Sequence, residues 1–185
     1  MRTEDIYGNL PVMETERMIL RKITLGDIDD IHAYASNPEV SKYVFWNAHQ
    51  SRADTEEYVK AVLSLYEQGK LAPWGIHFKE DHKLVGTADF VSWQPQHKTA
   101  EIGYALSQDY WGKGIATEAA RELIRFGFKN MDLVRIQAKC LVANKGSERV
   151  MEKAGMTYEG ILRKYVLIKG IHYDVKMYSI VKEDT

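Results

Sequence analysis

Hydrophobic and polar residues follow strand-like and helix-like periods in turn along most of the chain. Residues 17–23, RMILRKI, alternate as a half-buried strand does. Residues 25–37 then carry a short helical pattern, which the Asn37-Pro38 pair ends because a proline disfavours helical geometry in the residue before it. The pattern therefore predicts a strand followed by a helix.

The clearest helical pattern covers residues 51–69. It opens with a Ser-x-x-Asp cap and ends at Gly69. One face collects the larger apolar side chains, namely Tyr58, Val59, Val62, Leu63 and Tyr66. Three strands separated by short turns follow and are typical of an antiparallel meander, over residues 73–79, 84–93 and 99–106.

The second half of the chain continues the alternation. We expect a helix, a strand, a helix and a final strand pair joined at Lys169-Gly170, over residues 117–130, 135–141, 145–154, about 157–168 and 171–180. The whole pattern predicts an α/β fold in one domain, residues 1–185, with a mixed sheet of about seven strands.

Composition narrows the possible functions. The chain has 185 residues, which is enough for one sizeable core and short for two ordinary domains. Its 25 Lys and Arg against 26 Asp and Glu give no basic surplus, so we expect no direct nucleic-acid partner. No apolar run approaches the roughly 20 residues of a membrane span. Acidic residues also stand where a secretory signal would be apolar, so we expect a cytoplasmic protein with no membrane partner.

Residues 109–118, DYWGKGIATE, connect the strand 99–106 to the next helix. Glycine lets a ligand approach the backbone, and the first N–H groups of a helix lack internal acceptors, so this joint can bind a pyrophosphate. A tight loop with glycines for geometry alone is the competing interpretation. A P-loop spacing is absent from the sequence, and Thr117 stands where a dinucleotide fingerprint needs its third glycine.

Several spaced motifs are more specific than one glycine pair. The segments 110–128 and 144–156 resemble the coenzyme A-binding loop and the following Asn-x-x-Ser helix of the GNAT superfamily of N-acetyltransferases. The segments 13–31, 84–90 and 100–106 resemble its RimJ/RimL branch, the ribosomal-protein N-terminal acetyltransferases. This resemblance covers about residues 13–180. It implies the GNAT fold, acetyl-coenzyme A as donor, no metal, and a primary amine as acceptor, with a protein N-terminus as the leading candidate.

The resemblance also implies where the donor binds. The strands 99–106 and 135–141 should splay apart, and the pantetheine arm should insert between them. The donor-binding residues implied are Tyr104, Leu106, Trp111, Gly112, Lys113, Gly114, Ile115, Ala116, Thr117, Asn144 and Ser147. Trp111 stands where the superfamily usually has Gln or Arg, so we expect pyrophosphate binding to depend on backbone N–H groups.

The proton donor to the leaving thiolate is not evident from the sequence. Met151 stands where many superfamily members have a tyrosine acid, and by analogy Ser147 is the nearest remaining candidate, although a hydroxyl of this kind is a poor acid. Helix capping is the alternative role for Asn144 and Ser147.

Acetyl transfer to an amine also needs a base. Glu101 lies inside an otherwise small and apolar strand, on the same face as Gly103 and Ala105. Apolar burial would raise the pKa of its carboxyl, so we expect Glu101 to act as general base. A structural carboxylate paired with a basic residue is the alternative.

Other candidates carry less weight. The six histidines show no metal spacing, and Cys140 has no histidine neighbour in sequence, so a covalent acetyl-enzyme is disfavoured. Four aromatic residues either wall an acceptor groove or belong to the core, namely Trp46, Trp74, Trp93 and Tyr165. We therefore expect direct transfer in a ternary complex, by a monomer or homodimer. The alternatives are a small-amine acetyltransferase and a non-catalytic acyl-coenzyme A sensor.

Overall fold

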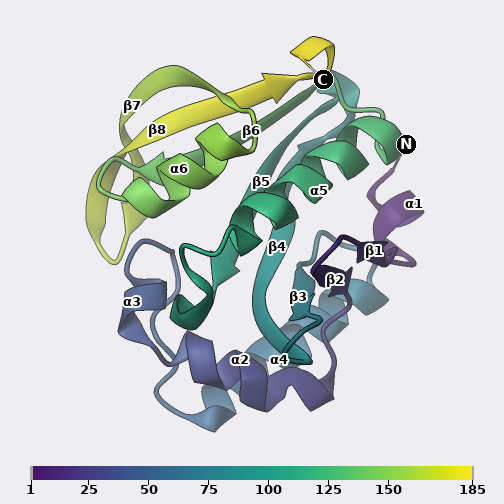
Figure 1. The fold of residues 1–185 in the computed structure, drawn as a ribbon, viewed down its shortest axis with the longest axis vertical. Helices are drawn as coiled ribbons and strands as arrows, with labels where there is room; N and C mark the ends of the chain where they lie inside the picture. The colour runs from purple at the N-terminus through teal and green to yellow at the C-terminus, as the bar shows by residue number, and fades with distance from the viewer. Residues whose placement is uncertain (1, 185) are drawn as a thin grey trace.

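The computed structural model describes residues 2–184, and an eight-stranded mixed sheet forms its centre (Figure 1). The strand order is β1-β2-β3-β4-β5-β6-β8-β7. The strands are β1 (Met13–Glu14), β2 (Met18–Arg21), β3 (Trp74–Phe78), β4 (Lys83–Gln94), β5 (Thr99–Leu106), β6 (Arg135–Leu141), β7 (Thr157–Ile168) and β8 (Ile171–Val181). Only the β5–β6 pair is parallel within this sheet; the other neighbours are antiparallel.

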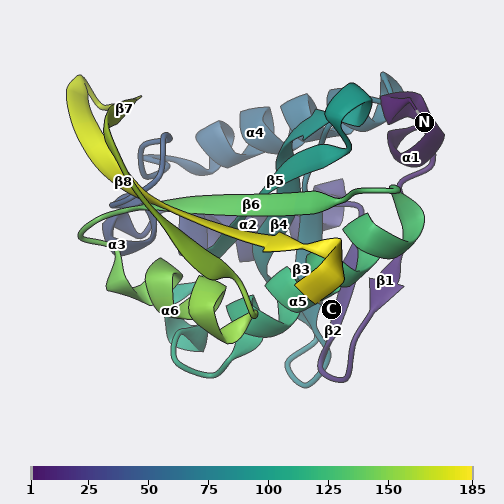
Figure 2. The ribbon, with the colours of Figure 1, turned by 90° about the horizontal axis from the view of Figure 1, so that it is seen from above.

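Helices cover both faces of the sheet (Figure 2). They are α1 (Thr3–Tyr7), α2 (Ile28–Ala35), α3 (Pro38–Ser41), α4 (Arg52–Glu67), α5 (Ile115–Asn130) and α6 (Lys145–Lys153). Helix α4 lies on one side of strands β5 and β6, and α5 and α6 lie on the other (Figure 2). The sheet therefore presents two different faces, which matters for the site below.

Strand β3 is fixed by an aromatic cluster in the core. The Trp74 side chain is fully buried and makes edge-on contacts with Phe90 of β4 and Phe126 of α5, with ring centroids 6.2 and 5.9 Å apart. Such pairs add about 0.5–1.5 kcal/mol beyond the burial of their area. This cluster locks α5 onto the sheet and so fixes the loop that precedes α5.

Much of the predicted element pattern is confirmed. The strands over 99–106 and 135–141 have the expected bounds. The predicted cap of α4 is a capping box, in which the Ser51 hydroxyl accepts from Asp54 N at 3.3 Å and the Asp54 carboxylate accepts from Ser51 N at 3.0 Å.

Two predictions need correction. The sheet has eight strands and not about seven, because the two-residue segment β1 pairs with β2 and is too short to show a period. Helix α5 begins at Ile115 and not at Thr117, because Gly114 takes the left-handed conformation with φ of 77° and the chain turns into the helix directly after it.

The parallel strands β5 and β6 separate along their length, as predicted. Their pairing covers only residues 99–101 and 135–137, although β5 continues to Leu106 and β6 to Leu141. Beyond Glu101, the β6-facing edge of β5 therefore has no paired strand. The backbone groups along this edge are open to an extended ligand arm.

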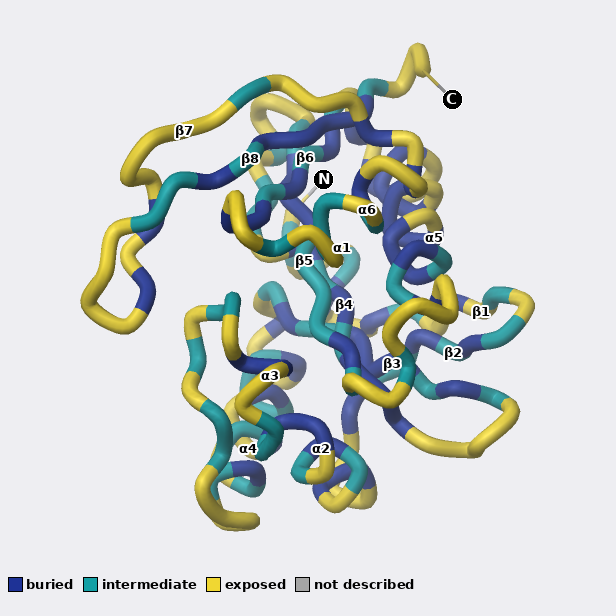
Figure 3. The backbone as a smooth tube through the Cα atoms, turned by 60° about the vertical axis from the view of Figure 1, so that its left-hand side comes forward, coloured by how far each residue is buried: buried dark blue, intermediate teal, exposed yellow. Residues whose placement is uncertain are grey.

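Strand β7 forms the edge of the sheet and is exposed over most of its length (Figure 3). A small apolar cluster holds the β7–β8 hairpin against the segment after α3, through Val166, Ile168 and Tyr43. The Lys169 ammonium also donates to the Ser41 carbonyl at 2.8 Å. Among the helices of residues 2–184, none is long and apolar enough to cross a membrane.

Candidate active site

The loop between β5 and α5 exposes backbone N–H groups. Gly112 and Gly114 have φ of 75° and 77°, a region that favours glycine. The Gly114 carbonyl accepts the helical bond from Glu118 N at 3.0 Å, so the N–H groups of the three residues between them precede the helical ladder. Three free donors at the positive end of a 16-residue helix favour an anion such as a pyrophosphate.

Two side chains from near the start of the chain, Thr15 and Arg17, hold this loop. The Glu118 carboxylate accepts from Arg17 Nε at 2.7 Å and from the Thr15 hydroxyl at 2.6 Å. Arg17 Nη1 also donates to the Lys113 carbonyl at 2.8 Å. Burial alone would raise the pKa of Glu118, but these hydrogen bonds hold it below its usual range. Glu118 is therefore an anchor for the loop.

Two predicted donor residues are engaged within the protein. The Trp111 indole N–H donates to the Leu106 carbonyl at 2.9 Å, which leaves that oxygen one further lone pair. Lys113 lies over the Tyr110 ring, with Nζ 5.1 Å from the centroid. The sequence placed both residues at the loop, and the structure brings both there.

A hydroxyl pair joins β5 to α6. The Tyr104 hydroxyl lies 2.9 Å from Ser147 Oγ and donates to the Ser147 carbonyl at 3.2 Å. The Asn144 side chain accepts from Ser147 N at 3.1 Å, so Asn144 caps α6, the alternative that the sequence left open. Burial raises the pKa of Tyr104 above its usual value, so this hydroxyl stays protonated.

The Tyr104 hydroxyl is a candidate that the sequence analysis missed. The resemblance implies Tyr104 as a donor-binding residue and gives its hydroxyl no chemical role. The signal was present in the alternation of β5, because residues 101 and 104 must point to opposite faces. Glu101 therefore lies on one side of the separating strands and the Tyr104–Ser147 pair on the other.

The surroundings of Glu101 differ from the apolar ones that we expected. Its buried carboxylate pairs with the Lys139 ammonium and accepts from Gln137 Nε2 at 3.1 Å. The parallel register sets Glu101 beside Gln137, and Lys139 follows two residues later on the same face of β6. Both carboxylate oxygens are thus engaged, and the assignment of Glu101 as general base stays a prediction.

The four aromatic candidates separate clearly. Trp74 belongs to the core and is no groove wall. Trp46 and Trp93 pack partly buried against the same core cluster. Tyr165 is exposed, and its ring centroid lies 5.8 Å from Lys139 Nζ, so the hairpin brings it beside Glu101.

Burial raises the pKa of the Cys140 thiol to about 11. A thiol with this pKa is almost fully protonated at neutral pH, which makes it a poor nucleophile. Within residues 2–184, no group of three or more His, Cys, Asp or Glu side chains is placed to hold a metal ion.

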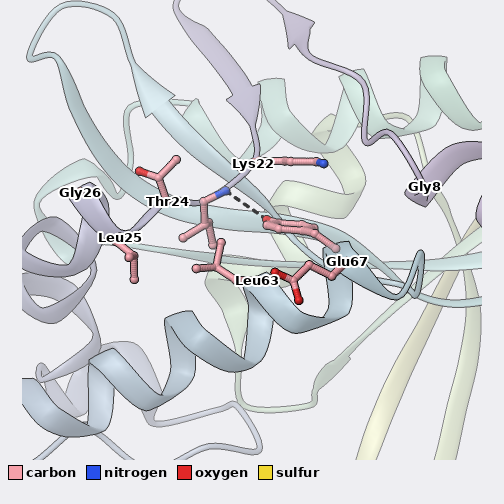
Figure 4. A pocket seen from close by; sticks show the side chains of 9 residues that line it. Gly8, Lys22, Thr24, Leu25, Gly26, Leu63 and Glu67 are labelled. Carbon is pink, nitrogen blue, oxygen red and sulfur yellow. Dashed lines mark hydrogen bonds between the residues drawn. The ribbon is translucent and has the colours of Figure 1, made fainter.

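A hollow of about 640 Å³ lies between α4 and the chain after β2 (Figure 4). Its lining includes Lys22, Leu63 and Tyr66, whose hydroxyl accepts from Ile23 N at 3.1 Å. None of the predicted donor or acceptor residues lines this hollow. The hollow therefore does not change the placement of the candidate active site at the separating strands β5 and β6.

Comparison with known proteins also assigns the chain to the GNAT acetyltransferases. The acetyltransferase (GNAT) domain family matches residues 17–157. The uncharacterized N-acetyltransferase YoaA of Bacillus subtilis is 36% identical over 172 residues, 93% of this chain and 97% of YoaA. The ribosomal-protein-serine acetyltransferase of Escherichia coli is 35% identical over 130 residues, 70% of this chain and 72% of that protein.

A solved acetyltransferase structure has a similar fold. The microcin C7 self-immunity acetyltransferase MccE, crystallised with acetyl-CoA and AMP, has a TM-score of 0.80 and 27% identity, and covers 90% of this chain and 93% of its own. The glycine loop, the separated parallel strands and the hydroxyl pair are the parts of this fold in which the sequence predicts the donor to bind. The chain belongs to the GNAT acetyltransferase family and is an acetyl-CoA-dependent N-acetyltransferase.

Proposed function

We propose that the acceptor is the α-amino group of a protein or peptide N-terminus, and that the acetyl group passes to it directly in a ternary complex. The observation that carries the proposal is the surface beside Glu101. Lys139 joins Glu101 to the exposed ring of Tyr165, and the apolar side chains of Leu162 and Leu167 continue outward along the same hairpin. Such a surface suits a chain that continues beyond the reacting amine.

The relative from Escherichia coli supports this choice, since it acts on a ribosomal protein by its name. In the proposed reaction, the backbone N–H groups of residues 112–117 hold the pyrophosphate of the donor. The pantetheine pairs with the free edge of β5, and a backbone N–H near Tyr104 stabilises the oxyanion. Tyr104 and Ser147 lie on the side where the thiolate leaves, and Glu101 lies on the side of the amine. A cytoplasmic location belongs to the same proposal.

Acetyl transfer should be measured with a panel of N-terminal peptides, a polyamine, a blocked lysine and small amines, with free coenzyme A as readout and mass spectrometry to locate the acetyl group. We expect the highest kcat/KM with a peptide that has a free N-terminus, and none with the same peptide carrying a blocked one. A higher kcat/KM with the polyamine or a small amine would contradict the acceptor proposal. Binding of coenzyme A without thiol release from any amine would indicate a sensor.

A further inference from the structure

Asp89 is a carboxylate that none of the roles above uses. It lies on β4 directly across from Gly103 of β5 in the antiparallel register. Gly103 shares the sheet face of Glu101, because the two residues are two apart on one strand. Gly103 is also the second residue beyond the last β5 residue that pairs with β6, so Asp89 faces the stretch where the strands separate.

The glycine leaves Asp89 open toward β5. A Cβ on Gly103 would lie 3.2 Å from Asp89 Oδ1 and 2.8 Å from Val91 Cγ1. Any side chain at position 103 would therefore press on the carboxylate or cover it. With glycine there, the β5 residue directly opposite Asp89 has no side chain to cover the carboxylate.

The Asp89 carboxylate has no hydrogen-bond or ion-pair partner within residues 2–184. Glu101, two residues from Gly103, has both oxygens engaged by Lys139 and Gln137. Asp89 is half-buried, and partial withdrawal of an unpaired carboxylate from water disfavours its charged form. Burial accordingly raises the pKa of Asp89 to about 7.

The titratable groups around Asp89 offer it no positive charge. The charge of Asp89 contributes to the raised pKa values of Tyr7 on α1 and of Tyr58 and Tyr66 on α4, after their burial. Helix α2, which packs on β4, contributes the buried phenol of Tyr34 and the carboxylate of Asp30, which accepts from Leu84 N at 2.9 Å. The Asp89 carboxylate is therefore free to pair with a cationic group of a ligand.

We propose that Asp89, rather than Glu101, removes the proton from the acceptor ammonium, and that the Glu101–Lys139 pair positions the amine beside it. The inference rests on the proposed function. The ammonium first gives one proton to the Asp89 carboxylate, which becomes a neutral acid and later releases that proton to solvent. The free amine then attacks the thioester carbonyl, and the carbon–sulfur bond breaks. The second proton of the attacking nitrogen is lost as the thiolate gains one, so the products are the amide and coenzyme A thiol.

The proton affinities favour an α-amine over a lysine. An α-amino group has a pKa of about 7.7–8.0, whereas a lysine amine has a pKa of about 10.4. A base that titrates at about 7 takes a proton from an α-ammonium at a cost of about one pKa unit, and from a lysine at more than three. Asp89 therefore deepens the proposal that the acceptor is an N-terminus.

The test compares Asp89→Asn with Glu101→Gln in the full chain. In the wild type, kcat/KM should rise with pH through an apparent pKa near 7. In Asp89→Asn, kcat should fall on the order of 10²–10³-fold at pH 7. Its remaining rate should rise only near the pKa of the amine. Glu101→Gln should keep the wild-type pH profile, and both variants should keep the wild-type Kd for coenzyme A.

Two further measurements need no acceptor, so they stand even if the acceptor proposal fails. Carboxyl ¹³C NMR of the free protein should show an aspartate titrating near 7 that disappears in Asp89→Asn. Because a raised carboxyl pKa costs the folded state stability as pH rises through 7, Asp89→Asn should gain Tm over the wild type at pH 8 and less at pH 5. An Asp89 pKa near 4, or loss of the limb near pH 7 in Glu101→Gln but not in Asp89→Asn, would overturn the proposal.

Discussion

The donor loop and the proposed acceptor face, the side chains around Glu101, use different chemical groups. The loop uses backbone groups, and the proposed acceptor face uses side chains. The donor loop presents backbone groups of one continuous segment, Trp111 to Thr117, and is held by the Trp111 indole and by Arg17. The proposed acceptor face consists of side chains from three strands, including Asp89, Glu101 and Lys139. We therefore expect the donor site to tolerate changes of side chain if the glycines remain, and the proposed acceptor face to be sensitive to single substitutions. The variants below test this difference.

After Asp89→Asn, the largest effect that we expect concerns the leaving thiolate. Tyr104→Phe removes the hydroxyl that pairs with Ser147, so kcat should fall roughly 10–100-fold with no change in the Kd for coenzyme A. Steady-state kinetics and calorimetry measure the two quantities. Tyr158→Phe on exposed β7 is the control and should keep wild-type kcat. A loss in Ser147→Ala without one in Tyr104→Phe would make the serine the proton donor.

Glu101→Gln should have the next effect. The change leaves Lys139 without its carboxylate, so we expect about a tenfold loss of kcat/KM, mainly through a higher KM for the amine. Glu159→Gln is a matched control, because it breaks an ion pair with Arg135 (2.6 Å) away from the separated stretch. Equal losses in the two variants would mean that Glu101 has only a structural role.

Gly112→Ala tests the backbone site. Alanine at φ of 75° costs about 1–2 kcal/mol of stability, and its methyl group would stand where we expect the pyrophosphate to approach. We expect about a tenfold weaker Kd for coenzyme A. Gly170→Ala has the same open surroundings and φ of 81° in the β7–β8 turn, so it should lose the same stability and keep the Kd. Unchanged affinity in Gly112→Ala would place the pyrophosphate elsewhere.

Cys140→Ala should have the smallest effect. The buried thiol is protonated at neutral pH because its pKa is raised to about 11, so it has no nucleophilic role in a direct transfer. We expect kcat within about twofold of the wild type and slow reaction of the native thiol with a disulfide reagent. An acetylated Cys140 trapped by rapid quenching and detected by mass spectrometry would contradict direct transfer.

The sequence predicts the features that depend on a local pattern and misses the side-chain pairs that depend on how distant segments come together. The bounds of β5 and β6 and the Ser51 cap were predictable because each depends on a local pattern. The Glu101–Lys139 pair was not, because it depends on the register of two strands with an entire helix between them. The Tyr104–Ser147 pair likewise joins residues 43 positions apart. Short β1 lacked a period, since two residues cannot show one.

The bond between Arg17 and the carbonyl of Lys113 has a practical consequence. The glycine motif cannot be moved into another protein by itself, because Arg17, next to strand β2, holds the conformation of the loop. A fragment that starts after β2 would keep every residue expected to touch the pyrophosphate and still lack the brace that sets their spacing. We expect an affinity tag inserted close to Thr15 to weaken coenzyme A binding, although Thr15 lies outside the glycine loop.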